Sequence, residues 1–122
     1  MNMRIVIAAL FITSAVSAQT VQEGRKLLLS QRYRSAKEIL EKTVAAAPTS
    51  AEAIYWLAQA NFESKNAAAA KDILRKGMEG ANGSNPLLLV AMGQAELTEK
   101  KSNDARQRFE TAISLTKAKD AG

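Results

Sequence analysis

Residues 50–80 read SAEAIYWLAQANFESKNAAAAKDILRKGMEG, and this stretch contains two successive helical patterns. Between residues 53 and 62 the apolar side chains recur with the period of an α-helix, and Ser50, a typical N-cap residue, precedes them. A polar turn at Lys65–Asn66 separates this pattern from a second apolar stripe over residues 70–78. The stretch therefore predicts a helical hairpin, in which two helices are joined by a tight turn.

The hairpin pattern occurs three times along the chain. Three columns of residues recur at spacings of 34 and then 35 positions: Gly24, Ala58 and Gly93; Ala36, Ala70 and Ala105; Leu40, Leu74 and Phe109. The additional residue falls in the turn-rich segment 80–85, where an insertion costs little. The small columns predict close approach of paired helices, with the large column filling the gap between them. Such a period is typical of arrays whose hairpins bury their apolar faces against one another.

These columns resemble the tetratricopeptide repeat family. The matching residues are Gly24, Leu27, Ala36, Leu40 and Pro48; Ile54, Leu57, Ala58, Ala70, Leu74 and Gly77; and Leu89, Met92, Gly93, Ala105, Phe109 and Ala112. The resemblance implies an all-α fold, a short right-handed α-solenoid of three helix-turn-helix repeats. Its units would span residues 19–49, 50–84 and 85–119, followed by a tail at 120–122. The alternative is a plain helical bundle with coincidental spacing.

The composition excludes several classes of function. The 122 residues include neither cysteine nor histidine, so the chain offers no thiolate or imidazole for catalysis or metal binding. The sequence has no glycine-rich phosphate loop, and its closest carboxylate pairs, Glu38/Glu41 and Glu96/Glu99, stand on polar helix faces. We therefore expect no enzymatic activity, no cofactor and no metal site.

The first 18 residues have the pattern of a secretory signal peptide. Arg4 precedes an unbroken apolar run at residues 5–12, and small residues lead to a cleavage site after Ala18. The apolar run is shorter than the roughly 20 residues that a membrane-spanning helix requires. We expect a bacterial exported protein, periplasmic or secreted, without a transmembrane span after cleavage. An uncleaved membrane anchor and a buried first helix are the alternatives.

The charge pattern argues against nucleic-acid binding. The chain carries 17 basic and 12 acidic residues, a formal net charge of +5. These charges alternate in sign along the expected helices, which is typical of solvated helix faces with ion pairs between neighbouring turns. Together with export, this pattern predicts no nucleic-acid partner.

The resemblance implies that the first helix of each pair lines a concave groove. The groove-facing residues would be Val21, Arg25, Leu28, Glu52, Tyr55, Gln59, Phe62, Leu87, Val90, Gln94 and Leu97. Apolar anchors with amide and guanidinium groups between them suit an extended peptide or an amphipathic helix, and predict a protein–protein interaction or scaffold module. Core packing between repeats is the alternative for Leu28, Phe62 and Leu97, and we expect Trp56 to pack rather than to bind.

The last expected helix bears apolar residues that no later helix would cover. It would end near Thr116 or Lys117, with Ile113 and Leu115 close to its end. Helical arrays normally finish with a polar outer face. We therefore expect either further repeats of a longer protein or self-association. The alternative function is accordingly that of a structural subunit for envelope assembly, stacked through Ile113 and Leu115.

Overall fold

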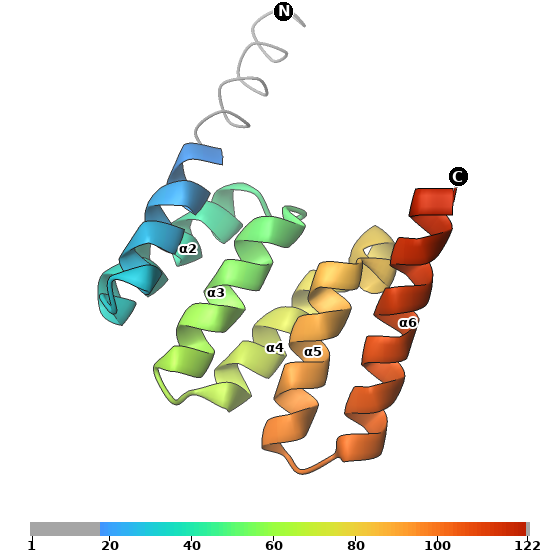
Figure 1. Ribbon diagram of the computed structural model, residues 1–122. Helices are drawn as coiled ribbons and strands as arrows, with labels where there is room; N and C mark the ends of the chain where they lie inside the picture. Colours follow the sequence, from blue (N-terminus) through green and yellow to red (C-terminus); the bar gives the residue numbers. More distant parts are fainter. Residues whose placement is uncertain (1–17, 122) are drawn as a thin grey trace, which may run out of the picture.

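The computed structural model describes residues 18–121, which form three helical pairs arranged in a row (Figure 1). An N-terminal helix, described over residues 18–29, pairs with α2 (Tyr33–Ala46), α3 (Ala51–Glu63) pairs with α4 (Ala67–Gly77), and α5 (Pro86–Thr98) pairs with α6 (Ser102–Ala121). A short 3-10 helix, η1 (Gly80–Ser84), precedes α5. No residue between 18 and 121 lies in a β-strand, and the predicted all-α solenoid is confirmed. The predicted signal segment, apart from Ala18, lies outside the described residues.

Side-chain caps begin three of the helices where the chain leaves a turn. The Ser50 hydroxyl accepts a hydrogen bond from the Ala53 backbone N–H at the start of α3, as the sequence predicts. The side-chain oxygen of Asn66 caps α4, and that of Asn85 caps α5 by accepting from the Leu87 N–H at 3.0 Å. Pro86 occupies the first turn of α5, where its missing N–H leaves no partner unsatisfied.

Each helical pair turns through one residue in the left-handed conformation. Gln31, Lys65 and Lys100 have φ angles of 61°, 61° and 62°, and they are spaced by 34 and then 35 residues. In each turn the backbone N–H of this residue donates to the carbonyl three positions earlier, at 3.0 Å. The next N–H donates to the carbonyl five positions earlier, at 2.9 Å, which closes the helix end. The three repeats therefore share this turn geometry, although none of the three positions is a glycine that would have predicted it.

Small residues let the paired helices approach closely. A Cβ placed on Gly24 would lie 2.6 Å from Leu40 Cγ, and one on Gly93 would overlap the ring of Phe109. Gly77 faces Ile54 in the same way, because a Cβ placed on Gly77 would lie 2.6 Å from Ile54 Cγ2. The predicted close approach at the small columns is thus observed, because the large column occupies the space that a side chain would need.

The core consists of two buried clusters that follow one another along the row. The first joins the N-terminal helix, α2 and α3: Leu28, Ala36, Leu40, Leu57 and Ala60. The second joins α3, α4 and α5: Ile54, Ala58, Ala70, Leu74, Leu88, Ala91, Met92 and Ala95. Because α3 contributes to both clusters, each pair is held in place by its neighbour.

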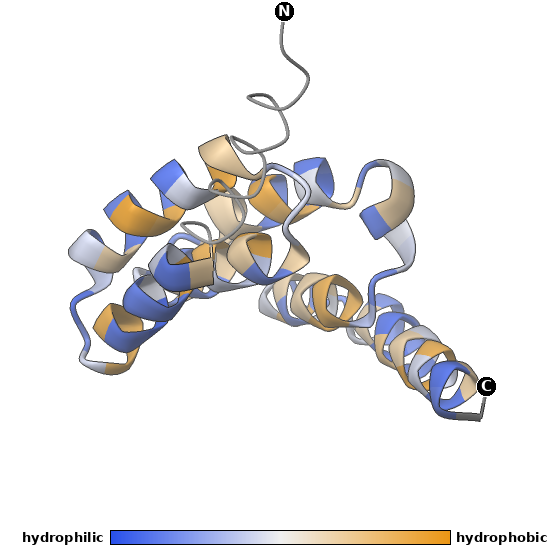
Figure 2. Cartoon of the chain, turned by 90° about the horizontal axis from the view of Figure 1, so that it is seen from above, coloured by the Kyte–Doolittle hydropathy of each residue, from blue (hydrophilic) through white to orange (hydrophobic). Residues whose placement is uncertain are grey.

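Seen from above, the helices form a curved row that ends at α6 (Figure 2). α6 continues to Ala121, beyond the expected end near Thr116 or Lys117, so residues 120 and 121 belong to this helix. The sequence AKDA after Lys117 contains good helix formers and no glycine or proline, which explains the extension. Within residues 18–121, no helix combines the length and the hydrophobicity needed to span a bilayer.

Candidate functional site

The predicted groove residues differ in exposure along the solenoid. Val21 and Leu28, on the N-terminal helix, are 3% and 7% exposed and belong to the core. Tyr55, Gln59 and Phe62 of α3 and Gln94 of α5 are half-buried. The exposed residues are Arg25 of the N-terminal helix, Glu52 of α3, and Leu87, Val90 and Leu97 of α5. The next pair along the row packs against the first helix of the pair before it. Among the described residues, no pair follows α5 and α6 to pack against α5. The sequence predicted that these residues line one groove, whereas packing buries some of them and leaves others exposed.

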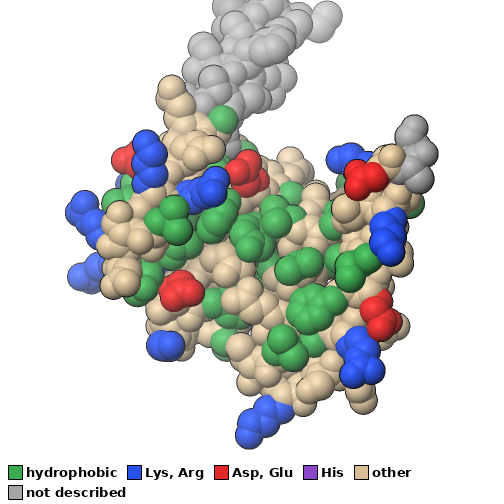
Figure 3. All heavy atoms as spheres, viewed as in Figure 1, with side chains coloured by type: hydrophobic (Ala, Val, Ile, Leu, Met, Phe, Trp, Pro, Cys, Tyr) green, Lys and Arg blue, Asp and Glu red, His purple; other side chains and the backbone are tan. Residues whose placement is uncertain are grey.

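Hydrophobic side chains gather on the face that α3 and α5 present in Figure 3. The part of this face between the N-terminal helix and α3 is a depression of about 300 Å³, here called the aromatic depression. Its lining residues are Leu28, Leu29, Gln31, Tyr33, Tyr55, Trp56, Gln59 and Glu63. Three of the predicted groove residues, Leu28, Tyr55 and Gln59, therefore meet in one place.

Trp56, which was expected to pack rather than to bind, contributes to the aromatic depression. Its ring meets that of Tyr55 edge to face, with 5.1 Å between centroids, and the Arg25 guanidinium lies 5.2 Å from its centroid. Both distances are typical of favourable aromatic and cation–π contacts. Trp56 also packs against the first core cluster, so the expected packing role is present as well. The sequence did contain a signal for this role, because Trp56 directly follows Tyr55, which was expected to line the groove.

Four further residues of the depression were missed: Leu29, Gln31, Tyr33 and Glu63. Leu29 is 71% exposed at the end of the N-terminal helix, and Tyr33 begins α2 on the other side of the turn. Only the first helix of each pair was expected to line the groove. The turn brings the start of α2 to the same surface, which a register based on one helix does not include.

A pair of side-chain amides links α3 to α5 on the same face. Gln59 Nε2 donates to Gln94 Oε1 at 2.9 Å, and Gln94 Nε2 donates back to Gln59 Oε1 at 3.4 Å. The two residues are 35 positions apart and occupy the same column of the repeat as Arg25. Each amide keeps a second N–H and a second lone pair, so the pair can still bond to a peptide backbone.

A second depression, here called the end depression, lies between α5 and α6 at the end of the row. It has a volume of about 470 Å³ and is lined by Pro86, Leu87, Val90, Ala112, Ile113, Thr116 and Lys117. Val90 and Ile113 are 42% and 55% exposed, so the expected apolar end is present at Ile113. Leu115 lies elsewhere, because residues two positions apart on a helix point to different sides.

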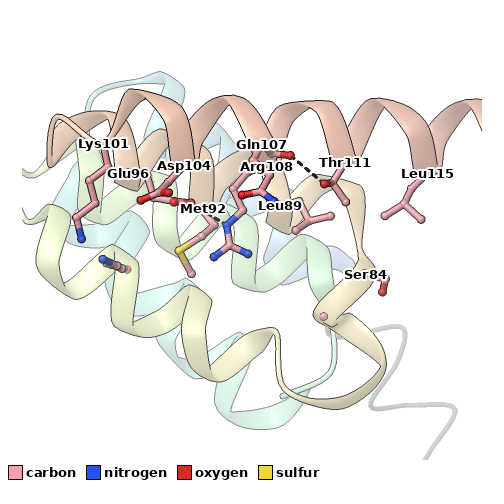
Figure 4. A pocket seen from close by; sticks show the side chains of 12 residues that line it. Ser84, Leu89, Met92, Glu96, Lys101, Asp104, Gln107, Arg108, Thr111 and Leu115 are labelled. Atoms are coloured by element: carbon pink, nitrogen blue, oxygen red, sulfur yellow. Dashed lines mark hydrogen bonds and ion pairs between the residues drawn. The ribbon is translucent and has the colours of Figure 1, made fainter.

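Leu115 instead lines a charged cleft of about 630 Å³ that also includes Lys71 of α4, Met92 of α5 and Arg108 of α6 (Figure 4). At its floor the Arg108 Nε donates to Glu96 Oε1 at 2.8 Å, and the Glu96 side chain is only 8% exposed. This ion pair satisfies a buried carboxylate and ties α5 to α6.

A second group of charges joins α4 to the turn between α5 and α6. Glu99 accepts hydrogen bonds from Lys71 at 2.5 Å and from Lys101 at 2.9 Å. The hydrogen bond from Lys71, and then that from Lys101, lowers the pKa of Glu99 from 4.5 to about 2. The same contact with Glu99 raises the pKa of Lys101. Because these ion pairs account for Lys71, Glu96, Glu99 and Arg108, we assign this side of the molecule a structural role.

The comparisons with known proteins agree with this architecture. A sequence model described as tetratricopeptide repeat matches residues 27–88, which are 62 of the 122 residues. No curated protein matches the chain by sequence.

Solved structures share the fold at low sequence identity. The chain is similar to the MamA RS-1 ArsTM double mutant, with a TM-score of 0.72 and 22% identity over 87% of this chain and 59% of that one. It is also similar to the second tetratricopeptide repeat domain of Spaghetti (RPAP3) bound to the HSP90 peptide SRMEEVD, with a TM-score of 0.71 and 22% identity over 81% of this chain and 91% of that one. With the repeat columns, the helical pairs and the sequence match in agreement, the chain belongs to the tetratricopeptide repeat family.

Proposed function

We propose that the chain is a non-catalytic interaction module that holds a peptide segment of another protein in the aromatic depression. The observation that carries this proposal is the convergence of Tyr33, Tyr55 and Trp56, from two helices, on one surface beside the polar groups of Gln59 and Glu63. Sites that bind peptides combine apolar anchors with a few placed polar groups in this way. A protein of the same fold, the Spaghetti domain, is bound to a peptide, which supports this class of ligand.

Binding in this site rests on preorganisation. The aromatic rings are held by the core and by each other, and the Gln59–Gln94 pair fixes two amides before a ligand arrives. A rigid site loses little conformational entropy on binding, so more of the contact energy remains as affinity. Leu29 and the aromatic rings then take apolar side chains of the peptide, and the amides bond to its backbone.

We infer from the first 18 residues that this binding takes place after export, in the periplasm or outside the cell. Support comes from Arg4, the apolar run at 5–12 and the small residues before Ala18. Amino-terminal sequencing of the protein recovered from a bacterial periplasm checks the proposal. A mature chain that begins at Gln19 is expected, and recovery of uncleaved chain in the cytoplasm contradicts it.

The peptide site is tested by selecting peptides from a displayed library on the immobilised chain. The selected peptides are expected to lose affinity by about tenfold or more when Leu29→Ser or Gln59→Ala removes one contact. Leu29 is largely exposed, so its substitution leaves the melting temperature unchanged. Ile113→Ser, at the end depression, serves as the matched control and is expected to bind normally. Peptides whose affinity is unaffected by both test variants contradict the site.

The end depression favours a second candidate function, that of a subunit in a larger assembly. Leu87, Val90 and Ile113 are exposed large apolar side chains, and all three line this depression, as at sites of protein–protein contact. Ile113→Ser would then change the size of the assembly isolated with the protein, whereas Leu29→Ser would not. Equal assembly size in both variants, measured by sedimentation velocity, contradicts this candidate.

A further inference from the structure

We propose that the end depression receives one amphipathic α-helix of a partner protein, packed as α5 packs on α3 and α4. The proposal deepens the second candidate function above, because it names the kind of partner that the surface fits. It is independent of the peptide site, since the two depressions have no lining residue in common.

The end depression repeats a surface that is covered twice within the same chain. Val90 and Ile113 stand in the columns of Tyr55 and Met78, 35 positions earlier. Tyr55 and Met78 pack against the second core cluster, to which α5 contributes four residues. One repeat earlier still, Val44 packs against the first cluster, to which α3 contributes Leu57 and Ala60. The covering element is therefore a helix each time.

The exposed fractions in one column of the repeat show the effect of having no helix packed over α5 among the described residues. Val21, Tyr55 and Val90 occupy equivalent positions, and their exposure rises from 3% to half-buried to 42%. Tyr55 packs against the second core cluster, to which α5 contributes. A helix over Val90 would complete the series by removing its apolar surface from water.

The covering helices indicate what the partner helix must carry. α3 covers its neighbour with Leu57 and Ala60, and α5 uses the same columns, Met92 and Ala95. A large flexible residue followed three positions later by alanine lets the helix axes approach while filling the depression. We expect the same pair on the partner, with an acidic residue beside Lys117 at the rim.

A second copy of this chain does not fit the same description. At the two covering columns its N-terminal helix carries Glu23 and Lys26, both exposed, and burying them would cost their hydration. Two copies joined through their end depressions would place one hollow against another, without a ridge to fill it. A partner helix meets neither difficulty.

The test uses a labelled synthetic peptide of residues 50–64, SAEAIYWLAQANFES, stapled between positions 52 and 59, away from the covering stripe. The matched control peptide carries Leu57→Glu and Ala60→Lys, the residues of the N-terminal helix in those columns. The full chain is expected to bind the first peptide and to bind the control at least about tenfold more weakly. Val90→Ser and Ile113→Ser are expected to weaken binding to a similar extent, and Leu29→Ser to leave it unchanged.

Several results would overturn the proposal. Equal binding of the two peptides, or no binding of either, would show that the covering stripe is not recognised. Loss of binding in Leu29→Ser but not in Ile113→Ser would place the peptide in the aromatic depression. A dimer of the full chain that Ile113→Ser dissociates would show that a second copy occupies the end depression. Melting temperatures of all variants, expected to be unchanged because these side chains are exposed, establish that each one is folded.

Discussion

At the scale of single residues, the helical pairs depend on three turn positions with positive φ. Gln31, Lys65 and Lys100 carry side chains in a conformation that glycine adopts without strain. Each of them is exposed, and each backbone N–H closes the preceding helix. The strain is therefore tolerated because the hydrogen bonds of the turn require this conformation, while the side chain itself makes no contribution to the core.

The turn geometry predicts that Lys65→Gly stabilises the protein. Glycine removes the steric cost of the left-handed conformation, but it also gives the unfolded chain more conformational freedom, which lowers stability. The net result is an expected increase of about 0.5–1 kcal/mol in the free energy of unfolding. Thermal unfolding followed by circular dichroism measures it. Lys65→Ala, which keeps the Cβ, should give no gain, and Ala68→Gly within α4 should destabilise. A lower melting temperature for Lys65→Gly would contradict this interpretation.

At the scale of elements, the packing within each pair depends on a small residue facing a large one. Gly24 faces Leu40 in the first pair, and Gly93 faces Phe109 in the third. In the second pair the corresponding residues are Ala58 and Leu74, which lie together in the core. The same architecture therefore accepts two combinations, and the larger ring of Phe109 requires the smaller partner.

The third pair should accordingly not tolerate a methyl group at position 93. We expect Gly93→Ala to destabilise the protein by about 1–3 kcal/mol, because its Cβ overlaps the Phe109 ring. Combining it with Phe109→Leu recreates the alanine–leucine pair of the second unit and should recover part of the loss. Chemical denaturation of the two single variants and the double variant measures the coupling. Purely additive effects would contradict the proposed contact.

The charges around Glu99 predict a pH dependence of the contact between α4 and the turn before α6. The folded pKa, about 2, lies below the usual 4.5, so the carboxylate stabilises the fold above pH 4.5 and this contribution disappears as the pH falls toward 2. Glu99→Gln should lower the melting temperature slightly at pH 7 and leave it unchanged near pH 2. Glu38→Gln on α2 is the control. An equal difference at both pH values would exclude the ion pairs as its cause.

At the scale of the whole molecule, stability is distributed along a row of neighbours. The two core clusters share α3, and α5 reaches the rest of the chain through the second cluster. In such an array, the loss of one junction separates the pairs on its two sides. The position of a substitution should therefore decide which part of the chain opens first.

Leu88 and Leu40 provide a matched comparison, since both are fully buried but in different clusters. Leu88→Ala is expected to cost about 2–5 kcal/mol and to increase amide exchange mainly in α5 and α6. Leu40→Ala should cost a similar amount and increase exchange mainly in the N-terminal helix and α2. Hydrogen-exchange mass spectrometry distinguishes the two patterns. Uniform exchange along the chain in both variants would show a single cooperative unit instead.

Much of the fold followed from local patterns. The caps at Ser50 and Asn85 and the turn at Lys65 were predictable, because they depend on residues adjacent in the chain. The candidate site was less predictable. Tyr55 and Gln59 were expected on the surface and line the aromatic depression, but Trp56 was assigned to packing alone and Tyr33 was overlooked. Whether a helical residue faces solvent or a neighbour depends on elements distant in sequence.

The sequence by itself determined that this protein is a row of helical pairs, because the 34- and 35-residue spacing places small and large residues in the same register each time. Only the tertiary structure decided which members of a column are exposed. Val21 and Val90 occupy the same column, yet one is buried and the other is not. The physical reason is that burial depends on the helix packed over a residue, and α5 has no such helix within residues 18–121.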